Sequence, residues 1–382
     1  MPWKRTDVRE QRVQFVIRAK GGQEGMSRLC AEYGVSRPTG YRWLRRYEEV
    51  GSVEGLREHS RRPRHSPRQT VAELEGQVVG LRARYGWGAR KLQVLLAREG
   101  VALPVVTIHR ILRRRGLVNE GDSHPAAVQR FERPEPNQLW QMDGKGPYRL
   151  REGSCYPLSI LDDHSRYAVG LYALRQFQAE PVHRCLVETF ECYGVPEAML
   201  MDHGSLWWGT TSAAGLTWLA VALIQQGIRL IYGRIRHPQT QGKVERFHRT
   251  LDQAVRFRGR PREWEPWPSL LAEVRWEYNH IRPHEALGMN PPASRYRPSP
   301  RSYCAHPPEW QYPAGSVVRR LNTQGCLDWD RERWFVCEAL AGEWVRLEKL
   351  EQTILVSYRH MYIREIDLEK GRTTPLALSR DE

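Results

Sequence analysis

The sequence lacks the features that mark a secreted or membrane-embedded protein. Its seven cysteines form no C-x-x-C pair, so neither a disulfide framework nor a zinc finger is indicated, and we expect reduced, mostly buried thiols. The opening residues, MPWKRTDVRE, contain no apolar signal core. The longest apolar run, residues 216–224, is far shorter than the roughly 20 residues that span a bilayer. We therefore expect a protein that acts inside the cell.

Negative charge is scarce in the first third of the chain. Residues 1–120 hold 25 Lys and Arg against 12 Asp and Glu, whereas residues 121–382 hold 34 against 32. A basic N-terminal segment followed by a near-neutral remainder indicates a polyanion-binding module and then a separate domain. The alternative is a cationic protein that is merely soluble.

The pattern of residues 1–59 predicts a helix-turn-helix DNA-binding domain with three short helices. Gly34-Val35 forms the turn, and Ser36 is the expected N-cap of a third helix over residues 37–49. An ordinary three-helix bundle with a charged face is the alternative. The candidate DNA contacts on the third helix are Arg37, Thr39, Tyr41, Arg42 and Arg45.

A second helix-turn-helix domain is predicted over residues 71–120. Residues 60–70 form a basic linker before it, in which Arg62 and Arg64 are candidate DNA contacts, although a solvated tether fits equally well. Thr107 is the expected cap of the last helix. That helix carries the further candidates His109, Arg110, Arg113 and Arg114, with Arg115 completing a basic cluster that grips phosphate without reading bases.

After a connector over residues 121–137, the pattern changes to alternating strands and helices. Residues 138–299 predict an α/β core with three strands, then helix, strand, helix, strand and helix. The expected strands cover residues 139–143, 155–162, 167–174, 198–201 and 228–232, and the expected helices residues 179–193, 216–226, 242–256 and 268–285.

Three acidic residues of this core carry the chemistry. Asp143 and Asp202 each close an apolar strand, and Glu245 lies in a helical run; 58 residues separate the first pair and 42 the second. Such a layout brings three carboxylates to one edge of a sheet. They can hold two Mg²⁺ or Mn²⁺ ions, with Asp143 bridging both, for phosphoryl transfer to water or to a DNA 3′-hydroxyl.

Residues 138–296 closely resemble the integrase core of bacterial insertion-sequence transposases, which share the retroviral-integrase, ribonuclease-H-like fold. The resemblance extends less sharply to the N-terminal units and the C-terminal region. Two features depart from the pattern: His203 stands where relatives commonly have Asn, and the last spacing is longer, with extra residues around 207–215. The matching motifs are WQMD (140–143), LDDHSR (161–166), MDHG (201–204), HPQTQGKVERFHRTL (237–251) and YNHIRPHEAL (278–287).

The resemblance implies that Asp143, Asp202 and Glu245 are the catalytic DDE acids. It implies cutting at the terminal inverted repeats of an element and joining of their 3′ ends to target DNA. A homodimer or higher oligomer on double-stranded DNA is expected, as is a location in the bacterial cytoplasm, at the nucleoid when DNA is bound.

Residues near the acids leave alternatives open. His248 and Arg249 lie one turn beyond Glu245, where they contact DNA or pair with Asp252. Lys243 and Arg246 are expected at backbone phosphates. Asp162 and Asp163 are interpreted as turn-forming residues and not as ligands. For Trp207 and Trp208, stacking on an unpaired base and packing under a loop are both consistent with the sequence, and Asn279, His280, Arg282 and His284 are interpreted as structural.

The remaining chain predicts a linker over residues 300–315, a small β-barrel over 316–370 and a tail over 371–382. The predicted fold is therefore multidomain, with all-α helix-turn-helix units, a ribonuclease-H-like core and a C-terminal barrel. Two other functions remain as alternatives: a catalytically inactive, transposase-derived DNA-binding regulator, and a structure-selective nuclease of the same core fold.

Overall fold

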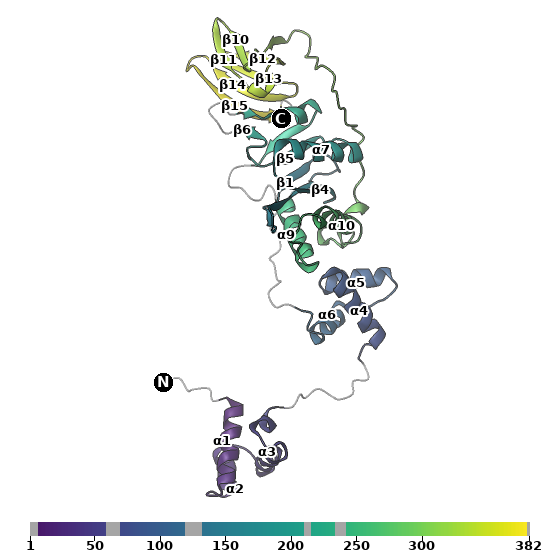
Figure 1. Cartoon of the computed structure of the whole chain (residues 1–382), viewed down its shortest axis with the longest axis vertical. Coiled ribbons are helices and arrows are strands. Elements are labelled where there is room, and N and C mark those ends of the chain that lie inside the picture. Colours follow the sequence, from purple (N-terminus) through teal and green to yellow (C-terminus); the bar gives the residue numbers. More distant parts are fainter. Residues whose placement is uncertain (1–6, 59–68, 119–131, 210–214, 234–241, 380–382) are drawn as a thin grey trace. The chain divides into compact units, whose positions relative to one another are not determined.

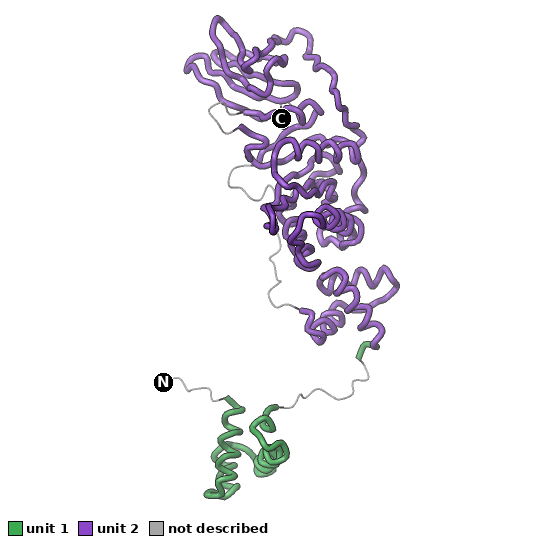
Figure 2. The backbone as a smooth tube through the Cα atoms, viewed as in Figure 1, with its two compact units in different colours: residues 1–71 green, residues 72–382 purple. Residues whose placement is uncertain are grey.

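The computed structural model describes residues 7–58, 69–118, 132–209, 215–233 and 242–379. The chain divides into two compact units, residues 1–71 and residues 72–382 (Figure 2). Arg62, Arg64 and the first part of the HPQTQGKVERFHRTL motif lie outside the described residues. In the described part of the chain, no helix is both long and apolar enough to cross a membrane.

The first unit consists of three helices and a short 3-10 turn. Helices α1 (Val8–Gly21), α2 (Met26–Glu32) and α3 (Arg37–Val50) are followed by η1 (Val53–Leu56). As predicted, Ser36 caps α3, since its hydroxyl accepts from the Thr39 amide at 3.4 Å. A Cβ on Gly40 would lie 2.7 Å from the Cys30 sulfur and 2.8 Å from the Phe15 ring, so α3 packs closely on its neighbours there.

The second set of three helices comprises α4 (Ala72–Tyr85), α5 (Ala89–Arg98) and α6 (Val105–Arg114). Ile108, Ile111 and Leu112 of α6 are buried with apolar residues of α4 and α5. The predicted Thr107 cap is wrong. Helix α6 begins earlier, after Pro104, whose carbonyl accepts from the Thr107 amide at 2.9 Å; Thr107 therefore lies inside the first turn.

The core is a mixed sheet in the strand order β4-β3-β1-β5-β8, with β2 extending the β1 edge of β3. Strands β1, β3 and β4 pair antiparallel, whereas β1, β5 and β8 run parallel. Strands β1, β3, β4, β5 and β8 follow the predicted order, whereas β2 was not predicted. The strands are β1 (Trp140–Gly144), β2 (Tyr148–Arg149), β3 (Ser154–Asp162), β4 (Ala168–Leu174), β5 (Ala198–Met201) and β8 (Arg229–Tyr232).

Four helices and a short hairpin complete the core. Apolar residues of α7 and α8 share one buried cluster with the sheet, and those of α9 and α10 share another, so each face of the sheet is covered by helices (Figure 1). The elements are α7 (Ala179–Tyr193), α8 (Trp218–Gln225), α9 (Gly242–Phe257), α10 (Pro266–His280), β6 (Trp208–Gly209) and β7 (Gly215–Leu216), followed by the turns η3 (Glu285–Leu287) and η4 (Pro292–Ser294).

The C-terminal region differs from the predicted barrel. Five strands form an antiparallel sheet in the order β15-β14-β13-β12-β9, and no pairing of β15 with β9 closes it in the described residues. Its buried apolar residues belong to the same cluster as residues of β7 and α8. The strands are β9 (Val317–Arg320), β12 (Trp344–Leu350), β13 (Thr353–Tyr358), β14 (Met361–Asp367) and β15 (Arg372–Ser379), with a separate hairpin of β10 (Cys326–Trp329) and β11 (Glu332–Phe335) and the turn η5 (Glu338–Leu340).

The predicted tail is also wrong, because residues 372–379 form β15 and pair with β14.

Candidate active site

Asp143 and Asp202 lie at corresponding ends of neighbouring parallel strands. Trp140 pairs with Met199 and Gln141 with Leu200, so the register continues towards Asp143 and Asp202. Asp143 is on β1, and its side chain is 24% exposed. Asp202 directly follows β5, is exposed, and accepts from the Gly204 amide at 3.0 Å. The carboxyl ends of parallel strands thus supply two acids to one edge of the sheet.

Glu245 lies in the first turn of α9, and its charge acts on Asp143. Val244, Phe247, Leu251 and Val255 of this helix are buried, at the spacing of one helical face, while Glu245 is exposed. Packing of the apolar face therefore leaves Glu245 on the side of α9 that faces away from the core.

The three carboxylates influence one another electrostatically. The pKa of Asp143 is raised to about 6 by burial and then by the negative charges of Asp202 and Glu245, against a backbone hydrogen bond from Gly144. Among the described residues, however, no three His, Cys, Asp or Glu side chains lie close enough together to hold a metal ion. The acids are near enough to repel one another without forming a closed ligand set.

The chemistry of these donors, though not their present spacing, suits a divalent cation. Mg²⁺ prefers a few carboxylate oxygens and completes its shell with water and phosphate oxygens. A cation between the acids would also offset the repulsion from Asp202 and Glu245, which adds to burial in raising the pKa of Asp143.

His248 lies beside Asp143 and Ser159. Its Nδ1 is 3.7 Å from Asp143 Oδ2, and its Nε2 is 3.1 Å from the Ser159 hydroxyl. Burial, followed by the nearby charge of Lys145, lowers the pKa of His248 to about 4, so the ring is neutral at pH 7. Asp252 accepts from Lys145 at 3.1 Å and from the Tyr148 hydroxyl at 2.6 Å, and its charge partly opposes the lowering of the His248 pKa.

The other basic residues predicted on α9 fall into two groups. Arg246 and Arg249 are exposed. Lys243 donates from Nζ to Asp163 Oδ1 at 2.5 Å, a partner that we did not predict. Burial lowers the pKa of Lys243 despite this opposing carboxylate. The charge of Lys243 is thus engaged within the protein.

The predicted DNA contacts on α3 are mostly exposed, as required of contacts to a ligand. Thr39 is the exception, because it is partly buried and its hydroxyl lies 2.9 Å from that of Ser36. The exposed candidates are Arg37, Tyr41, Arg42 and Arg45.

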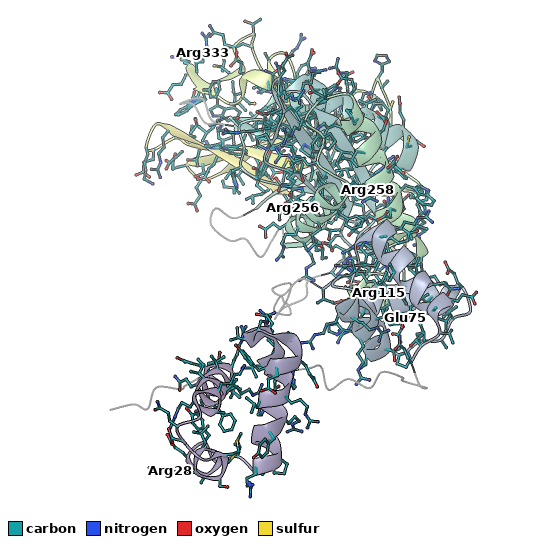
Figure 3. The ribbon with its side chains drawn as sticks, turned by 60° about the horizontal axis from the view of Figure 1, so that its bottom comes forward. Arg28, Glu75, Arg115, Arg256, Arg258 and Arg333 are labelled. Carbon is teal, nitrogen blue, oxygen red and sulfur yellow. The ribbon has the colours of Figure 1, made fainter. Side chains whose placement is uncertain are left out.

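On α6, the predicted basic cluster is divided. His109, Arg110 and Arg113 are exposed. Arg114 and Arg115 both form ion pairs with Glu75, whose side chain is buried in α4; the Arg115 pair measures 3.2 Å (Figure 3). The sequence suggested phosphate contacts for this cluster and gave no sign that Glu75 would pair with it.

The structural interpretations of the motif residues fit the geometry. Asp162 accepts from the Ser165 amide and hydroxyl at 2.7 and 2.6 Å, as expected in a turn. The Asn279 side chain bonds both the amide and the carbonyl of Ala168, which ties α10 to β4. Trp207 is buried, which favours packing over stacking on a base.

Comparisons with known proteins agree with this architecture. Integrase core domain profiles match residues 133–238 and 226–292. A helix-turn-helix domain profile matches residues 11–64, and a homeodomain-like domain profile matches residues 39–112. Over these residues the chain is similar to the integrase core and helix-turn-helix domains of transposases and integrases. It combines helix-turn-helix DNA-binding domains with an integrase core, and such a core implies dependence on a divalent metal.

Three relatives come from bacterial mobile elements. The chain is 25% identical to the insertion element IS407 uncharacterized 31.7 kDa protein of Burkholderia multivorans, over 64% of this chain and 86% of that one. It is 28% identical to the insertion element IS476 uncharacterized 39.2 kDa protein of Xanthomonas euvesicatoria, over 60% and 67%. It is 24% identical to the transposase for transposon Tn552 of Staphylococcus aureus, over 61% and 53%.

Solved structures with similarity to this chain include a chain of the simian T-cell lymphotropic virus intasome in complex with PP2A regulatory subunit B56 gamma. It is 16% identical, with a TM-score of 0.38, over 73% of this chain and 91% of that one. The catalytic core domain of BIV integrase is 22% identical, with a TM-score of 0.32, over 42% and 93%.

Proposed function

We propose that the protein is a DDE transposase that cleaves the 3′ ends of an insertion sequence and joins them to target DNA. Asp143, Asp202 and Glu245 are the catalytic acids. Two Mg²⁺ or Mn²⁺ ions held by them would activate the attacking hydroxyl and stabilise the leaving oxygen.

One observation carries this proposal. Asp143 and Asp202 lie at corresponding ends of the neighbouring parallel strands β1 and β5, and the charges of Asp202 and Glu245 add to burial in raising the pKa of Asp143. Structural carboxylates in proteins usually gain a cationic partner or several hydrogen bonds. Mutual repulsion at the ends of strands is instead the arrangement expected of a site that gains its positive charge from a ligand.

The exposed basic residues of α3 and α6 support recognition of the terminal inverted repeats of the element. Contacts of this kind release counterions, so the affinity for DNA should fall steeply with salt. Because each element has two ends, a dimer or higher oligomer assembled on DNA is part of the proposal.

The test uses a labelled duplex that carries the inverted repeat flanking the gene, with Mg²⁺ or Mn²⁺ and a plasmid target. We expect metal-dependent cleavage at the 3′ end and joining to the plasmid. Asp202→Asn should reduce both to background while binding of the duplex is retained, because Asp202 is exposed and its removal leaves the core intact.

A matched control is Asp328→Asn, which changes an exposed Asp in the β10–β11 hairpin and should leave cleavage unchanged. Binding by wild type and variant alike without cleavage would indicate a DNA-binding regulator. Cleavage without joining, and without need for the inverted repeat, would indicate a nuclease.

A further inference from the structure

Asp163 is a fully buried carboxylate to which three distant segments donate. It lies in the turn between β3 and β4, with its side chain 0% exposed. Its Oδ1 accepts from Gln141 Nε2 at 2.7 Å and from Lys243 Nζ at 2.5 Å. Its Oδ2 accepts from the Arg133 amide at 2.8 Å.

The turn itself does not account for this arrangement. Asp162 supplies the local hydrogen bonds of the turn, since it accepts from both the amide and the hydroxyl of Ser165. The partners of the Asp163 carboxylate lie 22, 30 and 80 residues away in sequence. The side chain of Asp163 therefore joins separate elements.

Two of these partners are close neighbours of proposed catalytic acids. Gln141 precedes Asp143 by two residues on β1, so both side chains leave the same face of that strand. Lys243 precedes Glu245 by two residues in the first turn of α9, and its side chain is only 18% exposed. Lys243 Nζ also donates to the Asp163 carbonyl at 3.0 Å, which fixes the ammonium group at two points.

We infer that Asp163 is a positioning residue: through Gln141 and Lys243 it sets the separation of Asp143 and Glu245, and thereby the affinity of the site for divalent cations. This inference rests on the proposed function of the acids. Neither Asp163 nor Lys243 touches the reacting groups in this arrangement.

Stability alone is a weak reason to bury such an ion pair. Desolvation of two charges offsets most of their attraction, and a well-packed neutral pair is often as stable or more so. Removal of one partner is different, because it leaves an unpaired buried charge. Single variants should therefore lose stability, whereas the double variant, which has no unpaired charge, shows the effect on positioning alone.

The experiment compares wild type with Asp163→Asn, Lys243→Met and the double variant in the full-length protein. Mn²⁺ binding is measured by calorimetry and unfolding by heat. Hydrogen exchange measures protection of the amides of residues 246–249, whose helical acceptors are the carbonyls of the first turn of α9. An exposed pair serves as the matched control, through the double variant Asp328→Asn and Arg333→Met.

Both single variants should unfold at lower temperature, and the double variant should recover much of this loss. We expect the double variant still to bind Mn²⁺ at least tenfold more weakly than wild type and to lose protection at the amides of residues 246–249. Cleavage by it should recover at raised metal concentration. The control pair should change none of these quantities.

Wild-type Mn²⁺ affinity and protection in the double variant would overturn the inference and leave the proposed function intact. Failure of the wild type to bind Mn²⁺, or binding that is unaffected by Asp202→Asn, would instead overturn the proposed function, and the inference with it.

Discussion

The two helix-turn-helix regions have the same three-helix order but hold their basic residues differently. On α3, Arg42 and Arg45 are exposed, and Gly40 is the only buried residue. On α6, one face is buried in the core of the domain, and two arginines at its end are tied to the buried Glu75. A basic cluster in the sequence can therefore be a DNA contact in one domain and a part of the fold in the next.

The two regions also belong to different compact units of the chain. Residues 1–71 form a compact unit by themselves, whereas α4–α6 belong to the same unit as the integrase core. Arg98 donates to the Ile281 carbonyl at 3.0 Å, and the Arg282 guanidinium lies 5.4 Å from the Trp87 ring centre. The second domain thus packs on the YNHIRPHEAL segment, which gives this motif a structural role.

The largest effect should come from the exposed arginines of α3. Replacing Arg42 and Arg45 together by Ala removes two contacts, each worth about 1–3 kcal/mol if it reaches a base, so affinity for the inverted repeat should fall at least tenfold. Fluorescence anisotropy at fixed salt, with inverted-repeat and scrambled duplexes, measures this loss. Glu48→Ala and Glu49→Ala on the same helix are the controls, and an unchanged affinity of the arginine variant would remove α3 from the interface.

The next effect is a pH dependence of stability that comes from Lys91 of α5. Burial, and then the charge of Arg282, lower the pKa of Lys91 to about 7, with Glu285 opposing them. The unfolded chain therefore binds more protons than the folded chain between about pH 7 and 10.5, so stability rises with pH across this window. The slope contributed by Lys91 is at most about 1.4 kcal/mol per pH unit.

Lys91→Met should remove this slope and be more stable than wild type at pH 7. Urea denaturation at pH 7, 8 and 9 measures both changes. Lys349→Met, which alters an exposed lysine of β12, should keep the wild-type profile. Parallel profiles for wild type and Lys91→Met would show that the Lys91 ammonium stays solvated.

The sequence predicted features that depend on neighbouring residues, and it did not predict contacts between residues far apart in the chain. The predicted bounds of α7 and β5 are those observed, because helical periodicity and a short apolar run are local signals. The pairing of Glu75 with Arg114 spans 39 residues, and that of Asp163 with Lys243 spans 80. Alternation along β12–β14 revealed an apolar face, but nothing local indicates whether a barrel or the core covers it.

The smallest expected effect comes from the ion pairs between Glu75 and the arginines at the end of α6, which among the described residues have no counterpart on α3 at Arg42 and Arg45. Glu75→Gln removes the negative partner of Arg114 and Arg115 while it keeps the size of the side chain. Loss of these charge-assisted hydrogen bonds from a buried acceptor should lower the free energy of unfolding by about 1–3 kcal/mol. Glu73→Gln, at an exposed position of the same helix, should change it little.

Glu75→Gln, which should reduce stability, should at the same time strengthen the phosphate contacts of the protein. Once released from Glu75, each arginine that reaches a phosphate should steepen the salt dependence of binding by about 0.9. A variant that is less stable, and whose DNA affinity falls more steeply with salt, would establish that Glu75 keeps these arginines from contacting DNA. If stability and salt dependence both stay at wild-type values, Arg114 and Arg115 are already free for phosphate, and the two domains hold their basic residues alike.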